Sequence, residues 1–378
     1  MDAFPVDLLL RAAVVASLLG SLAVAVLADR PSGLGSALRK RFVLGIPWGT
    51  LVSAGFVLGV YLLVQGGLRN WYSPVVVPFR AWSYFYPFGM ATAAFSHNGA
   101  GHLIGNLVGT LTLAPLAEYA WGHFPRKRGT QTFSSLRTNP YVRGFVVFPA
   151  AVFVVGLLSS IFAIGPVIGF SGVVFAFAGV ALVNYPLGTV IALIGGDAIR
   201  LMYNALRTPT LTASGRPAYI STWWADIAIQ GHALGLLIGV LIGLAIVRTG
   251  RRGAHPSATR LWLGALLVAV EQSLWAVYWF RGGNTFVLYR AAGVVLVAGL
   301  AVVVVLAVVA SDDPLFEWDF GVDSGVVHNW QVAVGVLLLS TAAIAGPAVP
   351  ANLFTADSGG LPGDEVTVRD YEVTYAEN

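Results

Sequence analysis

The sequence predicts an all-α polytopic membrane protein, and its composition and the spacing of its apolar residues carry this prediction. Of its 378 residues, 57% are hydrophobic and only 11% are charged. A soluble domain usually has about a quarter of its residues charged. The apolar residues gather in stretches of about 20, the length that a helix needs to cross a hydrocarbon core of about 30 Å. The chain has no cysteine, so disulfides, thiolate metal ligands and cysteine nucleophiles are excluded.

Ten apolar stretches qualify as membrane spans. None of them alternates apolar and polar residues as the strands of a membrane barrel do, so each is expected to form a helix. They cover residues 8–27, 43–65, 101–121, 144–164, 167–183, 187–203, 224–247, 261–280, 291–310 and 331–349.

The first stretch, 8–27, has a second interpretation as a secretory signal. Ala23 and Ala25 resemble the small residues that precede a signal-peptide cleavage site. However, Asp2 and Asp7 stand where a signal peptide carries positive charge, and the stretch is longer than the usual 7 to 15 residues or so. A retained membrane helix is therefore the preferred interpretation.

Basic residues predict how the chain is oriented in the membrane. They cluster after the first, third and seventh stretches, so an even number of crossings separates each cluster from the next. All three clusters then lie on one side, which the positive-inside rule makes cytoplasmic. The amino terminus, the segment 66–100 and the residues after 350 are expected outside. The clusters are Arg30, Arg39, Lys40 and Arg41; Arg126, Lys127, Arg128, Arg137 and Arg143; and Arg248, Arg251, Arg252 and Arg260.

Two external segments have distinctive compositions. The segment 66–100 is rich in aromatic residues and broken by prolines, which predicts a structure lying at the headgroup level, with an ordinary loop as the alternative. The tail 351–378 is acidic and has too few apolar residues to form a core, so a mobile external tail is expected.

Four polar side chains interrupt the predicted spans. His102 and Asn106 lie in the third stretch, Ser171 near the start of the fifth, and His232 in the seventh. Such groups are costly inside a bilayer, so each is a functional hypothesis. At a rise of 1.5 Å per residue, they lie about 20 to 30 Å above the cytoplasmic ends of their helices. All four are therefore predicted to share one layer near the outer surface.

The faces of these helices allow the four side chains to meet. His102 and Asn106 are four residues apart and project from the same side of a helix. His232 shares its face with a stripe of glycines that begins at Gly235, and such a stripe lets a neighbouring backbone approach closely. A serine hydroxyl and an imidazole are thus expected to meet across two closely packed helices.

This combination is what nucleophilic catalysis requires. A serine hydroxyl becomes a nucleophile when a neutral histidine accepts its proton, and Asn106, His102 and the N–H of Ser171 are candidate donors to the oxyanion. Asp226 lies six residues before His232, about 120° around the helix, so a dyad is favoured over a triad. Each signal alone is weak, because a lone serine or histidine in a membrane helix is more often structural.

Together these residues resemble the rhomboid family of intramembrane serine proteases. The similarity covers residues 43–247 and rests on three motifs in the order that the family has them. The motifs are Phe95-Ser96-His97 followed by Gly101-His102-Leu103-Ile104-Gly105-Asn106, then Gly169-Phe170-Ser171-Gly172, and finally Gly231-His232-Ala233-Leu234-Gly235.

The resemblance implies a role for each matching residue. Ser171 corresponds to the nucleophile and His232 to its base, while His102 and Asn106 correspond to the residues that stabilise the oxyanion. Glu118 resembles a structural glutamate at the cytoplasmic end of its helix. Residues expected to shape the site without reacting are His97, Gly169, Gly172, Phe175 and Gly235.

The resemblance also implies a division of the chain. A six-helix rhomboid-like catalytic core is expected over residues 43–250. An extra helix and a basic cytoplasmic loop precede it in residues 1–42, about three extra membrane helices follow in 251–350, and the external tail occupies 351–378.

The implied function is a serine endopeptidase in the cell membrane that cleaves transmembrane proteins near the outer face. No cofactor, metal or nucleic acid is expected to take part. One alternative is an inactive relative that only binds membrane proteins, although such relatives usually lack the serine or the histidine. A transporter is less favoured because no inverted repeat is visible. A zinc protease is less favoured because H-E-x-x-H is absent.

Overall fold

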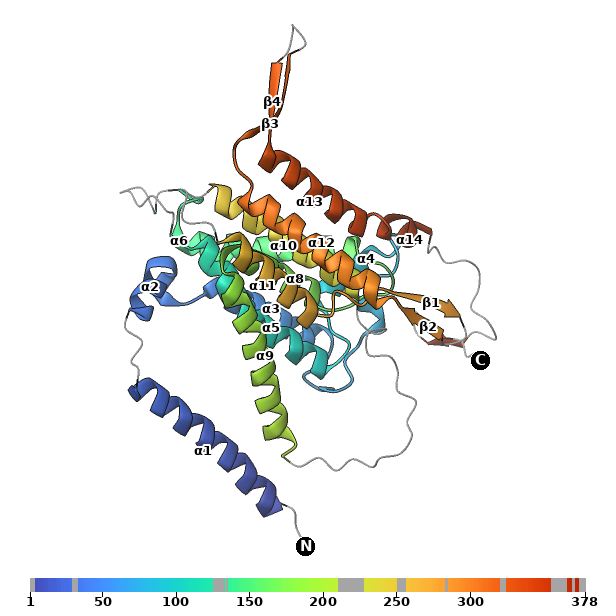
Figure 1. The fold of residues 1–378 in the computed structure, drawn as a ribbon. Helices are drawn as coiled ribbons and strands as arrows, with labels where there is room; N and C mark the ends of the chain where they lie inside the picture. The colour runs from blue at the N-terminus through green and yellow to red at the C-terminus, as the bar shows by residue number, and fades with distance from the viewer. Residues whose placement is uncertain are drawn as a thin grey trace.

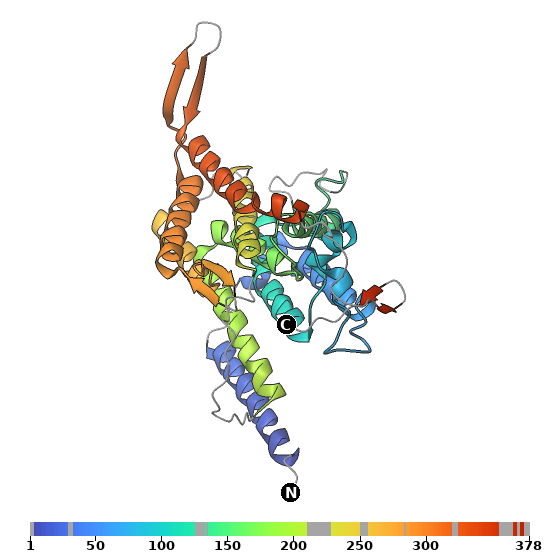
Figure 2. The ribbon, with the colours of Figure 1, turned by 90° about the vertical axis from the view of Figure 1, so that its right-hand side faces the viewer.

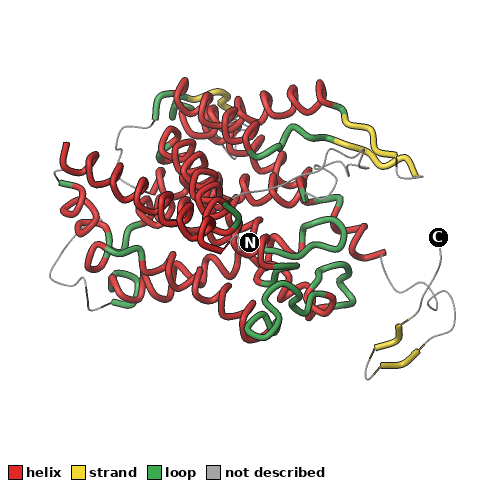
Figure 3. The backbone as a smooth tube through the Cα atoms, turned by 90° about the horizontal axis from the view of Figure 1, so that it is seen from below, coloured by secondary structure: helices red, strands yellow, loops and turns green. Residues whose placement is uncertain are grey.

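The computed structural model describes residues 4–28, 33–124, 133, 135–209, 228–249, 256–282, 285–319, 324–354, 366–368 and 371–373. Over these residues, helices make up the body of the molecule and short strands lie at its margins (Figure 3). The helices are α1 (Phe4–Ala28), α2 (Leu34–Arg41), η1 (Val43–Gly45), α3 (Trp48–Gly59), η2 (Val60–Val64), η3 (Val77–Phe79), α4 (Pro87–Thr92), η4 (Ala93–Phe95), α5 (Ala100–Trp121), α6 (Pro140–Val142), η5 (Arg143–Val147), α7 (Phe148–Ile161), α8 (Ser171–Asn184), α9 (Pro186–Arg207), α10 (Ile229–Thr249), α11 (Ala258–Glu271), α12 (Arg290–Val309), α13 (Asn329–Ala345) and α14 (Ala348–Phe354). The strands pair as antiparallel hairpins, β1 (Tyr278–Gly282) with β2 (Thr285–Leu288), β3 (Pro314–Asp319) with β4 (Ser324–His328), and β5 (Val366–Val368) with β6 (Tyr371–Val373).

Six of the described helical segments are long and apolar enough to cross a membrane. They are α5, Pro140–Ile161, α9, α10, α12 and Asn329–Phe354. Two shorter apolar helices, Trp48–Val64 and α8, contribute to the same hydrophobic core. The chain is therefore a multi-pass membrane protein with a mostly helical fold. The first predicted stretch forms α1, which lies alongside α9 in both views (Figures 1 and 2), with the Arg11 guanidinium donating to the carbonyl of Arg207 at 3.3 Å.

The predicted span at 261–280 is wrong. Helix α11 ends at Glu271, so residues 272–280 of the predicted span are not helical. Its 14 residues extend about 21 Å, which, as for the 14 residues of α8, is less than a hydrocarbon core of about 30 Å. The helix stops because Ser273 has a φ of 59°, in the left-handed region that cannot continue a right-handed helix. The hairpin β1–β2 then leads into α12 (Figure 1). Of the three extra carboxyl-terminal helices predicted, the two candidate spans are α12 and Asn329–Phe354.

The tail predicted to be mobile from residue 351 begins inside a packed helix. Helix α14 covers Ala348–Phe354, and the Asn352 side chain is 1% exposed. Beyond it, only the short strands β5 and β6 belong to the described residues. The start of the tail is therefore anchored, which sequence composition did not indicate.

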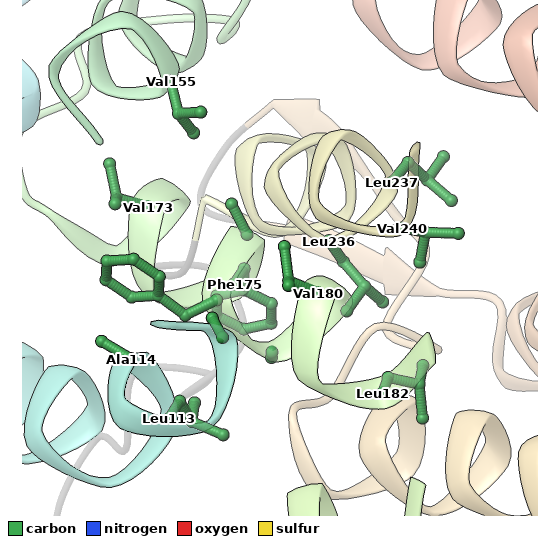
Figure 4. Close-up of a cluster of buried hydrophobic side chains, with 14 of the residues drawn as sticks. Leu113, Ala114, Val155, Val173, Phe175, Val180, Leu182, Leu236, Leu237 and Val240 are labelled. Atoms are coloured by element: carbon green, nitrogen blue, oxygen red, sulfur yellow. The ribbon is translucent and has the colours of Figure 1, made fainter. Parts of the chain in front are cut away.

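Helix α8 lies at the centre of the core. From Gly172 to Val183 nearly every side chain is buried, which explains why this stretch has no amphipathic pattern. Its partner is α10, and Val180 of α8 lies near Leu236 and Val240 of α10 (Figure 4). At 14 residues, α8 is also about 9 Å shorter than the hydrocarbon core. If its carboxyl end reaches one membrane surface, its amino end lies below the opposite surface.

Glycines let the backbones of α8 and α10 touch. A Cβ atom on Gly235 would lie 2.1 Å from the carbonyl oxygen of Gly172, and one on Gly239 would lie 2.1 Å from that of Ala176. From the other side, a Cβ on Gly179 would lie 2.2 Å from the carbonyl oxygen of Leu236. These contacts involve backbone, which cannot rotate away as a side chain can. The glycine stripe seen in the sequence therefore sets the distance between the two helices.

We expect Gly239→Ala to destabilise the protein, because the new methyl group forces α8 and α10 apart. Overpacking of this kind costs about 1–3 kcal/mol. Gly299→Ala in α12 is the matched control, since no atom of the described residues lies within 4 Å of the position that its Cβ would take. Thermal unfolding in detergent should show a lower Tm for Gly239→Ala and no decrease for Gly299→Ala. Equal Tm values for the two variants would contradict the close contact.

A buried ionisable cluster joins the helix ends at the side predicted to be cytoplasmic. The Glu118 carboxylate accepts hydrogen bonds from the N–H groups of Gly49 and Thr50 at 2.8 and 2.7 Å, and from the ring of His123. Nδ1 of that ring accepts from the N–H of Val43 at 3.0 Å. Glu118 thereby caps the first turn of α3, where free N–H groups favour a negative charge.

Two arginines from different basic clusters meet at the end of α5. The Arg41 guanidinium donates to the carbonyls of Tyr119 and Ala120, and Arg143 donates to the carbonyl of Gly122 at 3.0 Å. Cations are favoured at a helix carboxyl terminus, where carbonyl groups lack partners within the helix. The first two predicted basic clusters therefore share one end of the bundle.

Candidate active site

The structure brings Ser171 and His232 into contact. Ser171 is the first residue of α8, and His232 lies in the first turn of α10. The serine Oγ is 2.9 Å from Nε2 of the histidine, a hydrogen-bonding distance, and both residues are half-buried. The serine hydroxyl donates to Nε2 when the ring carries its proton on Nδ1. This is the arrangement in which the imidazole can take the serine proton.

The packing of α8 against α10 fixes the position of the His232 ring. The ring of Phe175, one turn after Ser171, stacks on it with the centroids 4.2 Å apart and the planes 13° apart. Gly172 and Gly235 let the two helices approach next to the pair. The histidine is therefore held by its flat face, which leaves its edge directed at the serine.

His97, His102 and Asn106 form a second polar group beside the serine. The amide nitrogen of Asn106 is 3.0 Å from Nε2 of His97, and both side chains are buried. The rings of His97 and His102 meet edge to face at 5.1 Å. Nδ1 of His102 is 2.9 Å from Oδ1 of Asn98. The structure thus places the His102 ring between His97 and the loop that leads to the serine.

Gly169 makes this placement possible. Its φ is +130°, which disfavours any residue with a side chain. A Cβ atom at Gly169 would also lie 2.4 Å from Cε1 of His102. The glycine two residues before Ser171 therefore keeps the imidazole of His102 against the backbone of the loop that leads to Ser171.

The hydrogen bond to Asn98 decides what His102 can donate. If Nδ1 donates to Oδ1 of Asn98, a neutral ring has no hydrogen on Nε2 and cannot donate to an oxyanion from that atom. His102 becomes a donor through Nε2 when the ring is protonated, or when the Asn98 amide turns over so that its NH₂ faces Nδ1. Asn106 has no such restriction. When one hydrogen of its NH₂ group is donated to Nε2 of His97, the second hydrogen remains to donate to an oxyanion.

Two residues near the site were not singled out in the sequence. Gln65 is buried, its Oε1 accepts from the N–H of His97 at 2.8 Å, and its Nε2 donates to the carbonyls of His97 and Val75, each at 2.8 Å. The available signal was a polar amide at the end of an apolar stretch. Asn98 lies before α5, which begins at Ala100, so helical spacing to His102 gave no signal for it.

A small cavity opens beside Ser171 and His232. Its volume is about 40 Å³, room for a small side chain or two to three water molecules. One wall is the loop before Ser171, which is held by a bridge between Ala81 and Val167 and by a hydrogen bond from the Gly169 N–H to the carbonyl of Ala93 at 2.9 Å. The lining residues are mostly small and comprise Ala93, Ala94, Ser159, Ser160, Ala163, Val167, Ile168, Gly169, Ser171, Gly172, Ala228, Gly231 and His232.

Among the described residues we find neither an acidic residue that would complete a triad with Ser171 and His232 nor a metal centre. Asp226, the acid weighed in the sequence, lies outside them. In the part of the chain that the structure describes, no three histidine or acidic side chains are grouped as metal ligands would be. No protein-family model, curated protein or solved structure matches this chain.

Proposed function

We propose that this protein is a rhomboid-like intramembrane serine endopeptidase that cleaves transmembrane proteins near the outer face of the cell membrane. The observation that carries the proposal is the 2.9 Å contact between Oγ of Ser171 and Nε2 of His232 at the start of two buried helices. The motifs that resemble the family support it, as do the cavity and the polar group of His97, His102 and Asn106 beside the pair. In this proposal residues 43–250 form the catalytic core.

The chemistry follows from the two contacting atoms. Oγ of Ser171 attacks the carbonyl carbon of the substrate while His232 takes the hydroxyl proton on Nε2. The oxyanion forms near the amino terminus of α8, where the N–H of Ser171 lacks a partner within the helix and the helix dipole favours negative charge. Asn106 supplies a further donor, and His102 supplies one through Nε2 when its ring is protonated or the Asn98 amide is turned over.

Collapse of the oxyanion completes the cleavage. The carbon–nitrogen bond breaks, and the His232 imidazolium returns its proton to the leaving amine, which leaves an acyl ester on Ser171. A water molecule, deprotonated by the same imidazole, then attacks the ester. The acid product departs and the serine hydroxyl is restored. Each step uses only the serine, the histidine, water and the oxyanion donors.

The geometry also restricts the substrate. A helical backbone keeps its carbonyls hydrogen-bonded and shielded, so a substrate helix must unwind at the bond to be cut. Helix-destabilising residues such as glycine near the cut favour this unwinding. The cavity of about 40 Å³ receives the side chain of the residue whose carbonyl is attacked, and its size suits a methyl group.

We expect the enzyme to prefer alanine over leucine at that position. The leucine side chain exceeds the cavity, and overpacking costs about 1–3 kcal/mol, which corresponds to about 10- to 100-fold in kcat/KM. Two otherwise identical transmembrane substrates, reconstituted with the protein in vesicles, measure this ratio. Equal kcat/KM values for the two substrates would contradict the proposal that the cavity selects this side chain by size.

Cleavage of a reconstituted substrate tests the proposed function. Mass spectrometry of the products should reveal one cut near the outer end of the substrate helix, and Ser171→Ala should abolish it. Binding of the substrate helix without any product, from wild-type protein and Ser171→Ala alike, would instead favour an inactive binding module.

A further inference from the structure

The turn at residues 161–164 forms part of the wall of the substrate cavity, and side chains from α10, from α14 and from the loop before α4 hold its backbone. It begins at Ile161, the last residue of α7, and leads into the loop before Ser171. Ala163 lines the cavity and faces Gly231, where a Cβ atom would lie 3.7 Å from that of Ala163. A shift of this turn would therefore change the width of the cavity beside the catalytic pair.

Asn352 of α14 binds two carbonyls of this turn. Its Nδ2 donates to the carbonyl of Ala163 at 2.9 Å and to that of Ile161 at 3.3 Å. The backbone carbonyl of Asn352 accepts from the N–H of Tyr84 at 3.1 Å. The Tyr84 hydroxyl in turn donates to the carbonyl of Ile161 at 3.0 Å. Asn352 is 1% exposed, so these hydrogen bonds are shielded from solvent. Figure 1 shows α14 at the same end of the bundle as α4, which follows Tyr84.

Gln230 binds the middle of the turn and joins it to α13. Its Nε2 donates to the carbonyls of Phe162 and Ile344, each at 2.8 Å, and its Oε1 accepts from the N–H of Ile164 at 3.1 Å. Gln230 stands two residues before His232 in the first turn of α10. One amide side chain thus links the cavity wall, the helix of the candidate base and a carboxyl-terminal helix that lies outside the rhomboid-like region.

We propose that α13 and α14 act as a built-in positioning element, in which Asn352 and Gln230 hold the turn 161–164 so that the cavity accepts only a small side chain. This inference rests on the proposed function. Neither residue is within the catalytic pair, and they act through the position of Ala163. The added helices thereby determine substrate selection at a site formed mostly by other parts of the chain.

The test compares substrate preference in Asn352→Ala with that of the wild-type protein. The readout is the ratio of kcat/KM for the alanine substrate to that for the leucine substrate. This ratio does not depend on the fraction of folded enzyme, so a purely structural role of Asn352 would not change it. Loss of a buried hydrogen-bonding amide should lower the ratio about fivefold. Ser340→Ala in α13 is the matched control, because among the described residues the Ser340 hydroxyl bonds only to the carbonyl of Val336 within its own helix.

Tyr84→Phe provides a milder variant that removes one hydrogen bond to the same turn. We expect it to lower the ratio about twofold. If Asn352→Ala folds, its ratio decides the test. If it does not fold, the ratio in Tyr84→Phe decides the test. A ratio unchanged from wild type in the deciding variant overturns the positioning role, as does a wild-type ratio near one. Absence of all cleavage by the wild-type protein would instead count against the proposed protease function.

Discussion

Alanine at His232 is expected to lower kcat for substrate cleavage by about 10⁴-fold or more, and alanine at Ser171 by a similar factor. Among the described residues, the base in contact with Oγ of Ser171 is Nε2 of His232, at 2.9 Å. Without that imidazole, no described group at hydrogen-bonding distance accepts the serine proton. Because the two side chains act as a unit, the double variant should be no slower than either single variant. Product formation in reconstituted vesicles measures all three.

Two matched variants control for the substitutions themselves. His328→Ala removes a histidine at the start of α13, where its ring contacts the carbonyl of Asp312, and Ser340→Ala removes an exposed hydroxyl from the same helix. Both should keep kcat within about twofold of wild type, as surface substitutions usually have small effects. Retention of more than about a tenth of wild-type kcat by His232→Ala would contradict its role as the base.

The second large effect is expected at Asn106. In the proposed mechanism, replacing it by alanine removes an amide donor from the oxyanion, which costs about 3 kcal/mol, or about 100-fold in kcat. KM should change little, because the interaction strengthens only when the carbonyl oxygen becomes charged. The kinetics are normalised to folded protein, since the same substitution leaves Nε2 of His97 without its partner.

Asn184→Ala is the matched control for Asn106. Asn184 ends α8, and its amide donates to the carbonyl of Val180 within the same helix at 2.8 Å. This variant should leave both kcat and KM near their wild-type values. An Asn106→Ala variant that raises KM at constant kcat would assign the residue to substrate binding rather than to the oxyanion.

The helical membrane fold could be predicted from composition, because long apolar stretches with few charges have few alternatives to spanning a bilayer. The meeting of Ser171 and His232 was also accessible, since polar groups at one depth on glycine-lined faces have few other partners. The end of α11 could not be predicted from the sequence. Apolar residues continue beyond Glu271, and the left-handed conformation at Ser273 that stops the helix has no glycine to mark it.

Side-chain contacts between distant segments were the least predictable part. Gln65 reaches His97 across 32 residues, and Asn352 reaches Ala163 across 189. Periodicity within one helix contains no information about such pairs. Composition was also misleading at the start of the acidic tail, because a single buried amide at Asn352 anchors α14 while the residues around it are typical of a loop.

Covalent labelling of the nucleophile tests the central idea most directly. Purified full-length protein is treated with a fluorophosphonate, which reacts with serines activated by a neighbouring base, and the modified residue is located by mass spectrometry. We expect a single adduct on Ser171 that disappears in His232→Ala and persists in His328→Ala. Labelling of another residue, or adduct formation on Ser171 at an undiminished rate without His232, would contradict a serine activated by that imidazole.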